Sequence, residues 1–151
     1  MTTIIRIATE ADLPGIVRLL ADDDLGRGRE RYAEPLPQAY TDGFRAMQRQ
    51  GGNDFLVAED AGQVVGCLQL TIIPGVSRMG ATRAQIESVR VDRGQRGKKL
   101  GEALMQDAIE RARSAGCSLV QLTTDKTRAD AHRFYERLGF KATHEGMKLA
   151  L

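Results

Sequence analysis

The stretch VRVDRGQRGKKLGEALM, Val89–Met105, joins an alternating apolar segment to a helical pattern through a basic, glycine-rich turn. Glycines allow tight turns and close approach of the backbone to a ligand. The first amide groups of the following helix have no partners within the helix. The turn also carries four cations among its three glycines: Arg93, Arg96, Lys98, Lys99, Gly94, Gly97 and Gly101. Composition alone leaves two interpretations open, a polyphosphate site or a solvated basic loop that caps a surface helix.

Spacing excludes two familiar phosphate motifs in this turn. The pattern GxxxxGK[ST] fails because Asp92 stands at its first glycine and Lys99 is neither Ser nor Thr. The dinucleotide pattern GxGxxG fails as well, because the glycines are at positions 94, 97 and 101. Any phosphate site here must therefore follow another pattern.

The flanking sequence predicts a mixed α/β domain. Apolar alternation predicts strands and a 3.6-residue apolar period predicts helices. We expect strands over residues 3–7, 54–58, 63–73, 83–91 and 118–123, helices around residues 16–20, 38–49, 100–113 and 129–138, and a last pair of short strands after Gly139. The strand–helix–strand order around residues 100–113 predicts at least one parallel pair. Because no repeat or linker interrupts the pattern, we expect one domain over residues 1–151.

Bulk properties favour a cytoplasmic globular protein. The chain has 151 residues, 42% of them hydrophobic and 28% charged, and a net charge of only +2, which gives no case for nucleic-acid binding. We find no signal-peptide pattern and no apolar stretch long enough to span a membrane. Cys67 and Cys117 lie far apart without a CxxC or Cys/His cluster, so we expect neither a disulfide scaffold nor a metal site.

Two segments resemble the motifs of the GCN5-related N-acetyltransferases. Motif A, whose loop is written [QR]-x-x-G-x-[GA], is matched by Val89-x-Val91, four further residues and then Arg96–Gly101. The one departure is Lys99, which stands at the position of the middle glycine. The segment DAHRFYERLGF, Asp130–Phe140, resembles motif B, and the opening IRIATEADLPGIVRLL is similar to the first strand and helix of the family. The resemblance covers nearly the whole chain in the right order.

The resemblance implies a fold and a cofactor site. It implies a central, mostly antiparallel mixed sheet of about six or seven strands, with a splayed parallel pair, flanked by about four helices. Pantetheine of acetyl-CoA would pair with the backbone of Val89, Arg90 and Val91, where the strand splays around a bulge. The pyrophosphate would lie on the amide groups of the loop residues Arg96, Gly97, Lys98, Lys99, Leu100 and Gly101. Arg128 replaces an asparagine that often contacts pantetheine; that contact is not carried over, but Arg128 stays a cofactor-binding candidate.

Two residues are candidates for proton transfer. Family members often place a glutamate at the position of Glu87 to accept the proton of the amine. Alternation would put Glu87, Val89 and Val91 on one face, where apolar neighbours would raise the pKa of the carboxyl. The alternative is a glutamate paired with an arginine at the sheet margin. Tyr135, at the general-acid position of motif B, would protonate the leaving thiolate and contact the cofactor, or else would only pack beneath it. A backbone N–H near Val91 would hold the oxyanion.

The function implied is direct transfer of an acetyl group from acetyl-CoA to a primary amine in a ternary complex. A small-molecule amine is favoured; the alternatives are a protein lysine or N-terminus, a longer acyl group, or a non-catalytic acyl-CoA-binding sensor. No metal, nucleic acid or membrane is expected, and a homodimer is plausible. The acidic run Asp22–Asp24 and the basic cluster Arg27–Arg31 are candidates for substrate selection, with residues 74–80 as the opposite wall.

Overall fold

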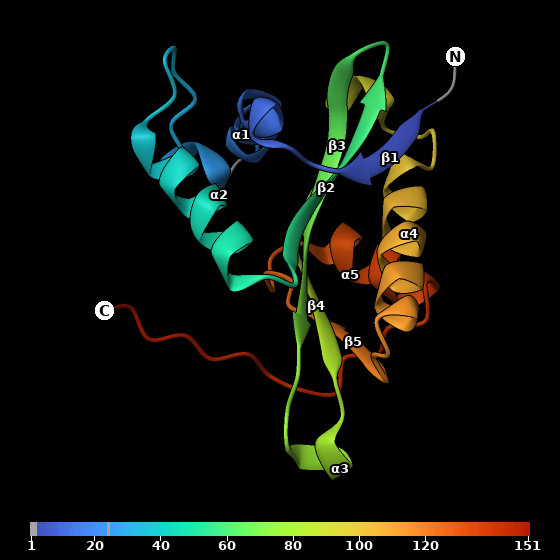
Figure 1. The fold of residues 1–151 in the computed structure, drawn as a ribbon. Helices are drawn as coiled ribbons and strands as arrows, with labels where there is room; N and C mark the ends of the chain where they lie inside the picture. Colours follow the sequence, from blue (N-terminus) through green and yellow to red (C-terminus); the bar gives the residue numbers. More distant parts are fainter. Residues whose placement is uncertain (1–2, 24) are drawn as a thin grey trace. The chain divides into compact units, whose positions relative to one another are not determined.

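The computed structural model of the protein describes residues 3–23 and 25–151. These divide into two compact units, Met1–Gln121 and Leu122–Leu151, and each is described by itself. The first unit contains the sheet and most of the helices, whereas the second contains the end of the last strand, one helix and an extended tail (Figure 1).

The sheet has five strands in the order of the sequence: β1 (Ile4–Ile7), β2 (Asn53–Asp60), β3 (Gln63–Ile73), β4 (Arg83–Val91) and β5 (Leu119–Leu122). The first four strands pair antiparallel, and β4 and β5 form the predicted parallel pair. The mixed α/β fold is thus confirmed, but the strand count of six or seven is wrong. The missing strands are the pair expected after Gly139: residues 140–151 form no strand, and the alternating side chains of Met147, Leu149 and Leu151 are exposed. An alternating pattern becomes a strand only where it finds a partner edge.

Helices cover both faces of the sheet. The elements before β2 are two short 3-10 turns, η1 (Glu10–Asp12) and η2 (Gly26–Gly28), and two helices, α1 (Leu13–Ala21) and α2 (Gln38–Gln50). Phe55, Val57 and Cys67 point to these helices and form one core cluster with Ile16 and Phe44.

The opposite face of the sheet packs against α4 (Leu100–Ser114), which follows the 3-10 turn η3 (Arg93–Gln95). A side chain at Gly66 would lie 2.9 Å from Leu104, so the helix approaches the sheet closely there. The remaining elements are α3 (Ser77–Gly80), a turn at the tip of the β3–β4 hairpin with Arg78 and Met79 in the left-handed region, and α5 (Ala129–Arg137).

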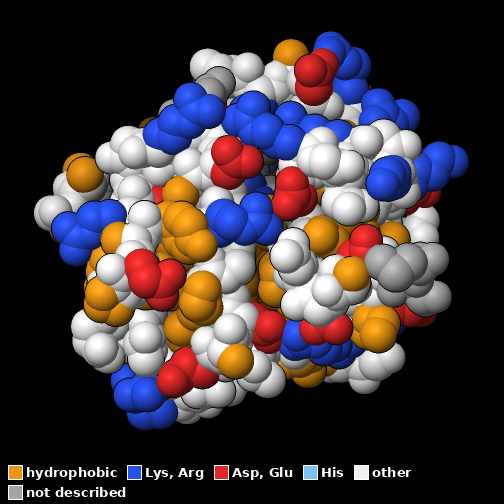
Figure 2. Space-filling model, turned by 90° about the horizontal axis from the view of Figure 1, so that it is seen from above, with side chains coloured by type: hydrophobic (Ala, Val, Ile, Leu, Met, Phe, Trp, Pro, Cys, Tyr) orange, Lys and Arg blue, Asp and Glu red, His pale blue; other side chains and the backbone are white. Residues whose placement is uncertain are grey.

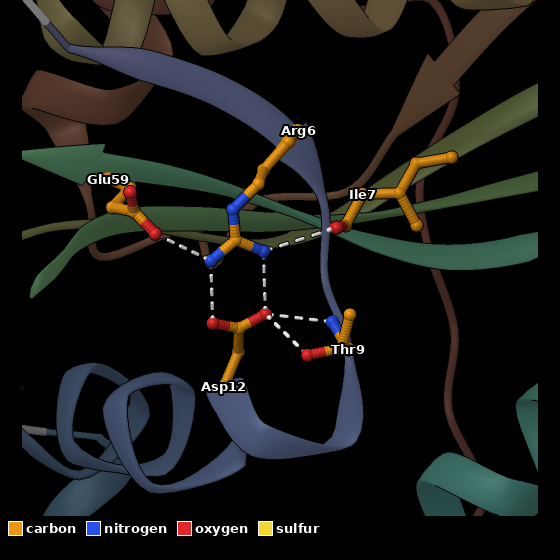
Figure 3. A network of polar contacts seen from close by, with 5 residues as sticks. All are labelled: Arg6, Ile7, Thr9, Asp12 and Glu59. Carbon is orange, nitrogen blue, oxygen red and sulfur yellow. Dashed lines mark hydrogen bonds and ion pairs between the residues drawn. The ribbon is translucent and has the colours of Figure 1, made fainter. Parts of the chain in front are cut away.

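A buried carboxylate fixes the start of the fold. Arg6 of β1 forms a two-pronged ion pair with Asp12, at 2.8 and 2.9 Å, and its Nη2 also donates to Glu59 of β2 at 2.8 Å (Figure 3). Asp12 in turn accepts the backbone N–H of Thr9 at 2.7 Å. Although Asp12 is buried, these bonds satisfy its charge. The network therefore joins β1, η1 and β2 ahead of the first helix.

Candidate active site

A bulge interrupts the pairing of β4 with β3. Gln69 pairs with Glu87 and Cys67 pairs with Arg90. Two residues of β4, Ser88 and Val89, therefore lie opposite one residue of β3, Leu68. Ser88 has a φ of 58°, a backbone conformation that residues other than glycine seldom adopt. The two-against-one pairing is a β-bulge, which bends the strand and re-aims the side chains beyond it. The bulge implied by the family resemblance is therefore present, and it centres on Ser88.

The bulge also corrects the predicted alternation. Directly paired residues point to the same face of a sheet, so Glu87 and Arg90 share the face of Cys67 and hence of α1 and α2. Val91 pairs with Gly66 and shares the α4 face. The prediction that Glu87 and Val91 share a face is wrong, because the extra residue reverses the alternation.

Glu87 does not have the surroundings on which its predicted role relied. Its side chain is exposed, and it lies opposite the polar Gln69. Among the described residues, no apolar shell covers this exposed carboxylate. Covering of the strand by a bound ligand would have to supply that desolvation. The role of Glu87 as a base stays a prediction.

The loop between β4 and α4 presents a row of amide groups. Gly97 has a φ of 83°, and Lys99, the N-cap of α4, has φ 58° and ψ 24°. These two left-handed residues turn the chain into the helix. Five backbone N–H groups have no hydrogen-bond partner among the described residues, and they belong to Gly97, Lys99, Leu100, Gly101 and Glu102. Converging amide groups at a helix N-terminus are suited to an anion.

The cations of this loop are available to a ligand. The side chains of Arg96, Lys98 and Lys99 are exposed, and within the described part of the chain none of them forms an ion pair. On the face that Figure 2 shows, Lys and Arg side chains are interspersed with carboxylates and with apolar side chains. Because these three cations form no ion pair among the described residues, their charge adds to the field of the amide groups.

Three ion pairs join the end of α1 to residues 90–93. Arg18 contacts Asp92 at 3.2 Å, Asp22 contacts Arg93 at 3.2 Å, and Asp23 contacts Arg90 at 2.8 Å. The acidic run that we considered for substrate selection thus has arginine partners at Asp22 and Asp23, while Asp24 lies outside the described residues. Sequence reasoning missed this link, because the pairs join residues about 70 positions apart.

The second unit carries Tyr135 and Arg128. The Tyr135 ring packs edge-on against Phe134 and Phe140, with centroid distances of 5.2 and 6.1 Å. Arg128 is the N-cap residue of α5 and is half-buried. Because this unit is described by itself, the approach of either residue to the β4–α4 loop stays a prediction.

The described part of the chain shows neither a group of residues that could hold a metal ion nor a helix long and apolar enough to cross a membrane. Burial raises the pKa of Cys67 to about 12, so this thiol is a core residue rather than a nucleophile.

Comparison with known proteins identifies the family. A family model described as "Acetyltransferase (GNAT) family" matches residues 15–140. The chain belongs to the GNAT family. GNAT proteins use acetyl-CoA as the co-substrate, and this GNAT protein is an N-acetyltransferase.

The relatives of this GNAT protein match it over most of its length. It is 34% identical over 149 residues to a glucosamine 6-phosphate N-acetyltransferase of Trypanosoma brucei brucei, covering 97% of this chain and 95% of the relative. It is 36% identical over 110 residues to an aminoalkylphosphonate N-acetyltransferase of Salmonella typhimurium, covering 71% and 69%. A solved structure of a transcriptional regulator from Bacillus halodurans C-125 is 49% identical, with a TM-score of 0.96 and coverage of 99% and 100%.

Proposed function

We propose that this GNAT enzyme, acting as one domain over residues 1–151, acetylates the primary amine of a small molecule that carries a phosphate or phosphonate group. The observation that carries the cofactor side of this proposal is the row of five amide groups over residues 97–102 that have no hydrogen-bond partner in the described part of the chain. The acceptor side draws on the substrates named for two relatives, both of which are amines with a phosphorus oxyanion.

The loop amide groups suit the pyrophosphate of acetyl-CoA. Pyrophosphate carries several acceptor oxygens on a compact anion, so it can bond several converging N–H groups at once. Lys98 and Lys99 would then neutralise part of its charge. Pantetheine would extend along the backbone of Val89, Arg90 and Val91, which brings the thioester beside the bulge.

The chemistry needs one proton acceptor and one proton donor. The neutral amine attacks the thioester carbonyl, and Glu87 takes its proton directly or through water. The carbon–sulfur bond then breaks, and Tyr135 donates a proton to the departing thiolate. A backbone N–H near Val91 holds the oxyanion between these two steps.

The loop between η2 and α2 supports an anionic acceptor. Arg29 and Arg31 are exposed on this loop, and Arg27 is exposed on η2 just before it. Tyr40 of α2 holds the loop in place, because its hydroxyl accepts the backbone N–H of Arg31 at 2.8 Å and donates to Glu30 at 3.0 Å. An arginine fork matches the geometry of a phosphate or phosphonate group.

Release of CoA thiol tests the proposal with two matched pairs of amines. We expect turnover of glucosamine 6-phosphate or 2-aminoethylphosphonate to exceed that of glucosamine or ethanolamine, and added salt to reduce the difference. Equal rates within each pair would exclude recognition of the anion.

Tyr135→Phe tests the donor separately. This variant should lower kcat about 100-fold or more, the usual contribution of general acid–base catalysis, while the Kd of CoA in calorimetry stays unchanged. Tight CoA binding by the wild type without thiol release on any amine would instead favour an acyl-CoA sensor.

A further inference from the structure

One carboxylate, that of Asp23, holds two separate segments of the first unit. Its Oδ1 accepts the backbone N–H of Gly26, the first residue of η2, and its Oδ2 lies 2.8 Å from Nε of Arg90. The carbonyl of Asp23 also accepts the N–H of Arg27 at 3.0 Å. A side chain at Gly26 would lie 1.9 Å from the carbonyl oxygen of Leu20, so only glycine fits this tight turn. The turn η2, which leads into the loop before α2, is therefore fixed to the same carboxylate that contacts β4.

The arginine on the other side braces the bulge. Nη1 of Arg90 donates to the carbonyl oxygen of Val89 at 2.9 Å, within the segment where Ser88 holds its left-handed backbone. Nε of Arg90 makes no aligned hydrogen bond, so its contact with Asp23 is an ion pair. The guanidinium thus contacts both the acidic residue after α1 and the backbone of Val89 within the bulge.

The Asp23–Arg90 pair is more buried than the two ion pairs beside it. The side chains of Arg90 and Asp23 are 16% and 14% exposed, those of Arg18 and Asp92 are 35% and 30% exposed, and those of Arg93 and Asp22 are 52% and 43% exposed. An exposed pair is screened by water and salt and constrains its partners little. A covered pair has already lost much of its hydration, so either partner left alone would move to recover it. The Asp23–Arg90 pair is therefore the contact that would hold its two segments in one arrangement.

We propose that Asp23 and Arg90 are positioning residues, which fix the acceptor-side loop, residues 25–37, to the segment of β4 that holds the thioester of acetyl-CoA. This inference rests on the proposed function, since it takes β4 as the pantetheine strand. Neither side chain touches the reacting atoms. The pair sets where an amine held by the loop lies relative to the thioester, and small errors in that distance reduce transfer strongly.

Kinetics of Asp23→Asn and Arg90→Gln test the pair, with glucosamine 6-phosphate and 2-aminoethylphosphonate as acceptors at saturating acetyl-CoA. We expect each variant to lower kcat/KM for the amine about tenfold or more, and to weaken the binding of CoA without acceptor by a clearly smaller factor. The double variant should be no worse than either single variant, because the two residues act as one unit. Arg90→Lys keeps the charge but loses the planar fork, so it should recover only part of the activity.

Glu10→Gln is the control for the loss of a carboxylate–arginine pair, because Glu10 of η1 pairs with Arg45 of α2 at 2.8 Å, and this more exposed pair does not include β4. If the role of Asp23 were purely structural, Asp23→Asn would lower the melting temperature. Its loss of kcat/KM relative to its loss of CoA affinity would then be the same as in Glu10→Gln. That result, or independent and additive effects of the two substitutions, would overturn the proposal.

Hydrogen exchange of the free enzyme makes the test independent of the acceptor. Asp23→Asn should speed exchange of the amides at residues 26–30 and also at residues 89–92, whereas Glu10→Gln should alter neither segment. Unchanged exchange at residues 89–92 would overturn the link between the segments. If Asp23→Asn speeds exchange in both segments but the wild type acetylates neither amine, the proposed class of acceptor is wrong. The proposed link between Asp23 and Arg90 would still hold.

Discussion

Replacing Lys99 with glycine should stabilise the protein. Lys99 stands immediately before α4 with φ 58° and ψ 24°, and a left-handed backbone costs a residue with a Cβ roughly 1–2 kcal/mol. Glycine removes that cost, but it also destabilises the folded state by about 0.5–1 kcal/mol, because the unfolded chain gains conformational entropy. The net expectation for Lys99→Gly is a gain of about 0.5–1 kcal/mol, or a rise in Tm of roughly 2 °C for a chain of this length.

Lys98→Gly is the control for this prediction. Lys98 is also exposed and carries the same charge, but it does not have a positive φ. Here glycine relieves no strain, so the variant should lose about 0.5–1 kcal/mol. In urea unfolding the two variants should therefore shift in opposite directions from the wild type, and their free energies of unfolding should differ from each other by about 1–2 kcal/mol.

Binding of CoA separates the charge from the backbone. Each variant removes one exposed cation, so each should weaken CoA by a similar, salt-dependent amount of about 0.2–1 kcal/mol in calorimetry. The reasoning is refuted if Lys99→Gly destabilises the protein as much as Lys98→Gly. It is also refuted if Lys99→Gly loses CoA affinity far beyond the control, because the amide path would then depend on the lysine side chain.

Three further outcomes follow from the structure. The Arg6 guanidinium lowers the pKa of Asp12, so the ionised carboxylate stabilises the fold above the unfolded pKa of about 3.9. Asp12→Asn should therefore cost about 1–3 kcal/mol in urea unfolding at pH 7. The difference in stability between wild type and variant should shrink as the pH falls through the lowered pKa. Gly101→Val should weaken CoA binding at least about tenfold in calorimetry, and intact affinity would refute the phosphate assignment. Because Cys67 is buried with a pKa of about 12, a disulfide reagent at pH 8 should label Cys117 but reach Cys67 only after unfolding.

Periodicity predicted most elements of the fold because those elements bury one side. The helix expected over residues 38–49 is α2, Gln38–Gln50, and the strand expected over residues 83–91 is β4, Arg83–Val91. Both carry apolar residues at the spacing of their own secondary structure. The pair of strands expected after Gly139 failed for the opposite reason, because a strand also needs a neighbouring edge, which a local pattern does not specify.

The candidate site was predicted in part. The order of residues located the loop at 96–101, but a face assigned by counting every second residue cannot anticipate an inserted one. Ser88 gives no sign in the sequence that it adopts a φ of 58°, so the faces of Glu87 and Val91 were misassigned. The link between Asp23 and Arg90 was invisible for a related reason: each residue looks like an ordinary surface charge until the fold brings the two together.

Lys99 shows why a loop of this kind can depart from its motif and keep its shape. The motif prefers glycine at this position, and the left-handed φ of 58° is the physical reason for that preference. A lysine there costs some stability, yet its side chain points into solvent and leaves the amide groups of residues 97–102 without partners in the described chain. The chain therefore trades about 1 kcal/mol of backbone strain for one more cation beside the proposed pyrophosphate. Substitution by glycine should reverse that exchange, with a gain in stability and a small, salt-dependent loss in CoA affinity.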